Sequence, residues 1–141
     1  MNVKSLFKYN EPRNLDLGLL ILRIVFGMMM FWGHGIGKWD RLFSGNEIRF
    51  GDPIGLGPEV SFYLIVFAEG FCSLLIALGL FTRAATIPLI IGMGVAFFSY
   101  HFSDPINSME KSFLFMMTFL VIFILGPGKF SLDHKIFKKS K

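Results

Sequence analysis

The segment Arg23–Lys38, RIVFGMMMFWGHGIGK, sets the expected architecture, because an apolar run long enough for a membrane helix contains an arginine and ends near a histidine. An unpaired cation at the centre of a bilayer costs about 2.5–3.5 kcal/mol, so an arginine within a span usually faces a protein interior and has a partner. At about 100° per residue, Arg23, Gly27 and His34 fall on one helical face. The segment therefore predicts a membrane helix whose polar face is directed into a bundle.

Four apolar segments account for most of the chain. Of the 141 residues, 53% are hydrophobic and 18 are Phe, which exceeds what a soluble domain of this size carries. Each segment approaches the roughly 20 residues needed to cross the hydrocarbon layer of a bilayer. We expect one all-α domain over residues 1–141, a four-transmembrane-helix bundle with spans at 15–35, 60–81, 84–102 and 109–125.

The positive charges lie mostly on one side of these expected spans. Three Lys or Arg residues precede the first span, Arg83 lies between the second and third, and five lysines follow the fourth, making nine against four on the other side. By the positive-inside rule, both termini are expected in the cytoplasm and residues 38–59 form an external loop. This loop should turn and should not form a long helix, because it holds glycines and prolines.

Two charged residues inside the expected spans predict an ion pair. Counting 1.5 Å per residue places Arg23 about 12 Å and Glu69 about 18 Å from the cytoplasmic ends of their spans, a difference that an arginine side chain can bridge. Each charge alone would be costly in lipid, and together they neutralise each other. We therefore predict an Arg23–Glu69 pair, which either clamps the helices in register or anchors a ligand head group or a proton-transfer step.

A second polar group is expected at the outer boundary. His34 and His101 lie about 28 Å and 25 Å from the inner ends of their spans, and so share one level. Glu110 begins the fourth span there, and Lys38 follows His34 by four residues. Histidine and glutamate are metal ligands, and an interfacial histidine can contact a quinone. Because the spacing is not a metal motif, we predict no metal site; ligand contact and plain interfacial polarity stay open.

The chain alone can carry little redox chemistry. Its single cysteine, Cys72, allows no internal disulfide and no CxxC pair, which excludes a thiol–disulfide relay within this chain. We find no haem-binding motif and no dinucleotide-binding fingerprint. Any electrons must therefore pass through a bound quinone or a partner. The net charge of +4 requires no nucleic acid, because a basic tail beside a membrane is attracted to anionic lipid.

Four strings in fixed order resemble the DoxX family of small bacterial membrane proteins: LRIVFGMMMFWGHGIGK, FGDPIGLGPE, FAEGFCSLLIALGLFTRAA and LGPGKFSLD. The match covers nearly the whole chain. The resemblance implies a four-helix bundle with recurring polar positions at Arg23, His34, Lys38, Glu69, Arg83, His101, Glu110 and Asp133. Some members are similar to a subunit of a thiosulfate:quinone oxidoreductase, and others are linked to membrane oxidoreductase complexes in oxidative-stress defence.

Three functions fit these expectations. The first is a quinone-linked membrane subunit of a redox or oxidative-stress complex, served by a soluble or membrane redox partner. Its candidate ligand-binding residues are Arg23, His34, Lys38, Glu69, His101 and Glu110. The second is a non-catalytic membrane scaffold or assembly factor that docks partner proteins through its outer loop. The third, transport of a small solute, is disfavoured because the chain has no internal repeat.

All three hypotheses place the chain as a multi-pass protein in the inner (plasma) membrane of a bacterium. The lipid bilayer is its expected surrounding, assembly into a homo-oligomer stays open, and no nucleic-acid partner is expected. An accessible cavity beside His34 and His101 would favour the quinone-linked subunit. A filled core at that level would favour the scaffold.

Overall fold

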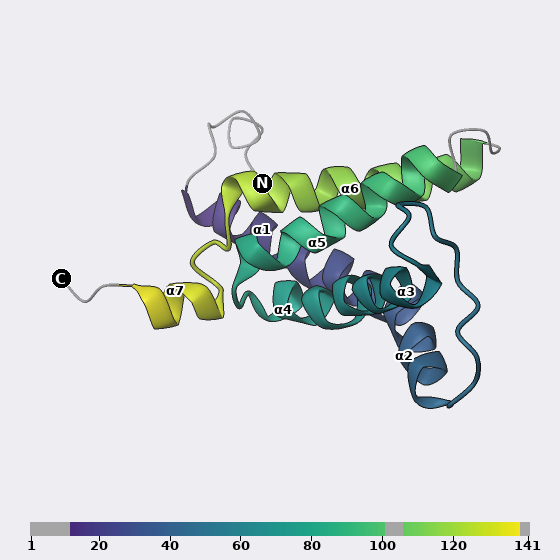
Figure 1. Cartoon of the computed structure of the whole chain (residues 1–141). Helices are drawn as coiled ribbons and strands as arrows, with labels where there is room; N and C mark the ends of the chain where they lie inside the picture. Colours follow the sequence, from purple (N-terminus) through teal and green to yellow (C-terminus); the bar gives the residue numbers. More distant parts are fainter. Residues whose placement is uncertain (1–11, 101–105, 139–141) are drawn as a thin grey trace.

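The computed structural model describes residues 12–100 and 106–138, which are helical apart from their connections and contain no strand (Figure 1). Three continuous helices are long and apolar enough to cross a membrane, at Asn14–Phe43, Pro58–Leu78 and Thr82–Ser99. They confirm an all-helical chain with several candidate membrane spans. The fourth expected segment forms α6 (Ile106–Leu125), a helix of 20 residues whose crossing of a membrane stays a prediction.

The first apolar helix is longer than the sequence predicted. It consists of α1 (Pro12–Met30), the π-helical segment Phe31–Gly35 and α2 (Ile36–Phe43). The loop expected at residues 38–59 is therefore shorter than predicted, because the irregular segment begins after Phe43. The extra helical turns gain contacts with the second helix: Lys38 reaches Glu69, and the Trp39 indole occupies the space above Gly70.

The second and third helices are joined by a tight turn. The second consists of α3 (Pro58–Val66), the π-helical segment Phe67–Cys72 and α4 (Ser73–Leu78). Gly79 ends α4 in the left-handed conformation, with φ of 72°, which favours glycine. The third helix begins three residues later with α5 (Thr82–Val95) and continues as the π-helical segment Ala96–Tyr100. The short connection makes the two helices antiparallel neighbours.

The helices pack closely around one apolar core. A Cβ at Gly27 would lie 2.8 Å from the Ser73 carbonyl oxygen, and one at Gly35 would lie 2.6 Å from the Glu69 carbonyl oxygen. The first two helices thus meet backbone to backbone, as small residues allow in membrane proteins. Figure 1 shows α5 and α6 side by side. The core between the helices includes Met30, Ala68, Cys72, Ile76, Leu89, Phe119 and Ile122.

The two ends of the bundle carry different connections. The irregular segment between α2 and α3 lies at one end (Figure 1). At the opposite end, residues 126–131 lead to the short helix α7 (Leu132–Phe137), which begins with a side-chain cap: the Ser131 Oγ accepts a hydrogen bond of 3.1 Å from the His134 backbone N–H. Each end also holds one group of buried polar side chains.

Candidate functional site

The first polar group is the Arg23 cluster, which we define as Arg23, Asp16 and Asp133 with the C-terminal segment 126–134. Arg23 is fully buried. Its Nη2 donates to the Phe130 carbonyl oxygen at 2.7 Å, and its Nη1 donates to the Ile76 carbonyl oxygen at 3.4 Å. Within the described residues it forms no ion pair. The predicted Arg23–Glu69 pair is therefore wrong.

The two carboxylates of the Arg23 cluster tie the C-terminal segment to the bundle. The Asp133 carboxylate accepts hydrogen bonds from the Phe81 and Thr82 backbone N–H groups at 2.7 Å and 2.8 Å, and so caps the start of α5. The Asp16 carboxylate accepts from the Lys129 backbone N–H at 2.9 Å. These bonds join residues far apart in the chain, so the cluster closes this end of the fold.

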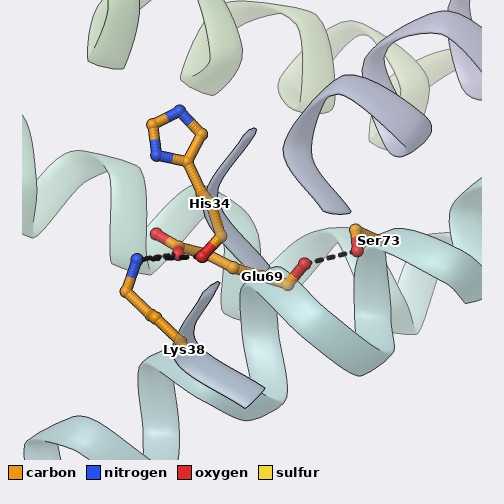
Figure 2. A network of polar contacts seen from close by, with 4 residues as sticks. All are labelled: His34, Lys38, Glu69 and Ser73. Atoms are coloured by element: carbon orange, nitrogen blue, oxygen red, sulfur yellow. Dashed lines mark hydrogen bonds and ion pairs between the residues drawn. The ribbon is translucent and has the colours of Figure 1, made fainter. Parts of the chain in front are cut away.

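The second polar group is the Lys38–Glu69 site (Figure 2). The Lys38 Nζ lies 2.5 Å from the Glu69 Oε2 and also donates to the His34 carbonyl oxygen at 3.3 Å. The Glu69 side chain is 5% exposed and that of Lys38 is 24% exposed. The Glu69 carbonyl oxygen accepts from the Ser73 Oγ at 2.5 Å. A buried carboxylate is thus paired with a partly buried ammonium between the first two helices.

Local helix geometry explains why these groups meet. His34 lies in the π-helical segment of the first helix, and Glu69 lies in that of the second. A π-helical turn inserts one residue into the helix and is frequent at functional sites. The two segments contact each other where Gly35 faces the Glu69 backbone. Lys38 stands one turn after His34, from where its side chain reaches both groups.

A cavity of about 600 Å³ lies beside the Lys38–Glu69 site, and both residues line it. Apolar side chains of the second and third helices form most of the remaining wall, including Ile65 and Ile91. Phe50 and Ile54 of the irregular segment also line it. The volume lies in the range of about 300–1,000 Å³ that is typical of pockets for small molecules.

The wall formed by the irregular segment is held by Asp52. We call residues 50–57 the lid segment. The Asp52 Oδ1 accepts hydrogen bonds from the Leu56 N–H at 2.9 Å and the Ser61 hydroxyl at 3.0 Å, and its Oδ2 accepts from the Gly57 N–H at 2.9 Å. These bonds, led by that from Gly57, lower the pKa of the Asp52 carboxyl below its usual value. The lid segment is thereby fixed to the start of α3.

The remaining candidate residues lie elsewhere. The His34 ring packs edge-to-face on Phe115 of α6, with centroids 5.8 Å apart, and Figure 2 shows it directed away from the ion pair. Glu110 is exposed near the start of α6. His101 lies outside the described residues. Within residues 12–100 and 106–138, no three His, Cys, Asp or Glu side chains gather as metal ligands would.

Sequence reasoning missed the partners that fix both polar groups. Asp52 and Ser61 hold the lid segment, and the Phe130 carbonyl oxygen receives Arg23. The turn residues around Asp52 were a usable signal, since an Asp before Pro and Gly residues typically accepts hydrogen bonds from the following backbone. No local pattern signalled the Arg23–Phe130 contact, which joins residues 107 positions apart.

Comparisons with known proteins agree with the helical architecture. The DoxX family profile matches residues 18–102. A Haemophilus influenzae protein is 30% identical over 129 residues, covering 86% of this chain and 85% of its own length. A second protein of that organism is 35% identical over 131 residues, covering 86% of this chain and 92% of its own length. Both are named only as uncharacterized proteins, and no solved structure matches. The chain belongs to the DoxX family.

Proposed function

We propose that this protein is a membrane subunit that binds an isoprenoid quinone at the Lys38–Glu69 site and works with a redox partner. The observation that carries the proposal is the largely apolar cavity of about 600 Å³ with an ion pair in its wall. A quinone has a polar head group and a long apolar tail. Such a cavity suits both parts, because ligand sites combine apolar walls with a few placed polar groups.

The roles of the residues follow from their contacts. Lys38 has three N–H donors and uses two of them on Glu69 and the His34 carbonyl oxygen, so one can donate to the head group. Reduction of a quinone takes up two electrons and two protons. The electrons come from the partner protein, and Glu69 is the carboxylate through which a proton reaches or leaves the head group. We therefore assign the head-group contact to Lys38 and Glu69 in place of His34. Contact by His101 stays a prediction.

The membrane arrangement is part of the proposal. We propose that α6 crosses the membrane as the fourth span, because its 20 residues lie beside α5 and match a bilayer in length. Both termini then lie in the cytoplasm of a bacterium, as the distribution of positive charges predicts. The Lys38–Glu69 site and the lid segment consequently lie near the outer face of the inner membrane.

Purification in mild detergent with retained lipid tests the proposal. Quinone is extracted and quantified by mass spectrometry from the wild type and from the double variant Lys38→Met/Glu69→Leu, which removes both charges together. We expect about one quinone per wild-type chain, as for one binding site at this cavity, and strong loss in the double variant. The matched control is Arg49→Met/Glu47→Leu, because this pair is 3.2 Å apart but lies on the exposed surface.

The result that contradicts the proposal is wild-type protein without quinone. Co-purification of specific proteins in that case would support the non-catalytic scaffold or assembly factor instead. Equal quinone loss in the exposed-pair control would show that the double variant acts through general instability and not through the cavity.

A further inference from the structure

The Glu69 carboxylate has one oxygen to which none of the described residues donates a hydrogen bond. Its Oε2 pairs with Lys38, and no described residue donates to its Oε1. The Glu69 residue is only 4% exposed. Glu69 lines the cavity, which is the space from which a ligand can approach this carboxylate.

The site therefore offers one acceptor and one donor at nearly the same point. The acceptor is Glu69 Oε1, because an ionised carboxylate accepts hydrogen bonds and cannot donate them. The donor is the third N–H of the Lys38 ammonium, whose other two N–H groups serve Oε2 and the His34 carbonyl oxygen. A buried acceptor left without a donor is costly. A ligand that satisfies this site must both donate and accept.

We propose that the Lys38–Glu69 site binds the reduced quinol more tightly than the oxidised quinone. The inference rests on the proposed function. A quinol hydroxyl donates to Glu69 Oε1 and accepts from the Lys38 Nζ, so both groups are satisfied. A quinone carbonyl can only accept. It leaves Oε1 without a donor and brings its own lone pairs toward a carboxylate.

Binding measurements with both redox forms test the preference. The probes are a decyl-substituted benzoquinone and its benzoquinol, kept reduced with excess dithionite under argon, in wild-type protein in detergent micelles. We expect the benzoquinol to bind about tenfold more tightly, as for one extra hydrogen bond to a charged group. Equal binding of both forms, or tighter binding of the quinone, overturns the inference and leaves the proposed function standing. Binding of neither form overturns both.

A redox titration of the bound probe provides a second readout in the wild type. Preferential binding of the reduced form stabilises it and raises the midpoint potential. A tenfold preference raises the two-electron potential by about 30 mV relative to the probe in empty micelles. An unchanged or lowered potential overturns the inference. This measurement needs no variant, so it does not depend on whether a substituted chain folds.

The variant Glu69→Gln locates the origin of the preference. The glutamine amide can accept through oxygen or donate through nitrogen, so either redox form satisfies it, and the preference should fall to about one. Glu59→Gln is the matched control, because Glu59 begins the same helix but is exposed. The control should keep the full preference. A preference retained in Glu69→Gln overturns the assignment to this carboxylate.

Discussion

Arg23 and Lys38 are two cations of the same long apolar helix, yet their side chains bind different kinds of partner. Arg23 donates to backbone carbonyl oxygens and faces tightly packed chain, where a Cβ at Gly79 would overlap its guanidinium. Lys38 forms an ion pair whose carboxylate partner lines a cavity. A buried charge enclosed by backbone serves the fold, whereas one beside a cavity is available to a ligand.

The chemistry of the two cations explains this difference. The arginine guanidinium has five N–H donors in a planar arrangement, which suits several carbonyl oxygens at once. Such oxygens are available at helix ends and turns, where the last carbonyls lack partners within the helix. Ile76 lies in the last turn of α4, and Phe130 lies in the C-terminal segment. The lysine ammonium is a compact charge, and pairs with a single carboxylate oxygen of Glu69.

The variant Arg23→Met should have the largest effect on stability, because it removes the fully buried cation. We expect a loss of about 3–5 kcal/mol in the free energy of unfolding, because the Phe130 carbonyl oxygen loses its donor, the Ile76 carbonyl oxygen keeps only the bond from the Gly79 N–H, and the C-terminal segment loses one of its anchors. Thermal unfolding in detergent measures the loss. The control is Arg83→Met, since Arg83 is exposed and, among the described residues, donates one bond of 3.3 Å to the Ile124 carbonyl oxygen. Equal losses in both variants would show that the Arg23 contacts are not stabilising.

A smaller effect is expected at the Lys38–Glu69 site. Lys38→Met leaves Glu69 as an unpaired buried carboxylate and should cost about 1–3 kcal/mol. The double variant Lys38→Met/Glu69→Leu should recover most of that loss, because no charge then remains to be paired. Unfolding midpoints of the two variants and the wild type test this. A double variant less stable than the single one would mean that Lys38 stabilises the fold through its other contacts.

The overall architecture followed from composition, while the pairing of charges did not. Runs of about 20 apolar residues identify helical membrane segments because the bilayer fixes their length. Glu69 is paired with Arg23 in the sequence-based prediction because of their depths in the spans, and Lys38 lies outside the first expected span. In the structure the first helix continues to Phe43, and Lys38 lies on the face of this helix that is directed toward Glu69. An error of a few residues in a helix end thus changed the ion pair.

The partner of Arg23 could not be found by counting depth. A depth count compares the positions of charged side chains within the expected spans. The acceptors of Arg23 are backbone oxygens, and one of them lies in a segment after the last expected span. Every residue has a carbonyl oxygen, so side-chain chemistry carries no signal for such a contact. The cavity was equally hidden, because it depends on how the lid segment folds back over α3 and α5.

The smallest expected effect is a local loss of hydrogen-exchange protection in the lid segment at acid pH. Asp52 has its pKa lowered from 3.8, chiefly by the hydrogen bond from the Gly57 backbone. The stabilisation that this carboxylate provides is therefore complete above pH 3.8 and is lost as the pH falls through its lower folded value. Hydrogen-exchange protection of the Leu56 and Gly57 amides should fall in that acid range, after correction for intrinsic exchange rates.

The Gly126 amide provides the comparison within the same experiment. It donates at 2.8 Å to the Ile122 carbonyl oxygen at the Arg23 end, and a backbone acceptor does not titrate. Its protection should therefore stay constant while that of the lid amides falls. Asp52→Asn should lower lid protection at neutral pH and remove its dependence on acid, because the amide has one strong acceptor and no ionisable group. Parallel loss at Gly126 and the lid would indicate acid unfolding of the whole bundle and not local opening of the lid segment.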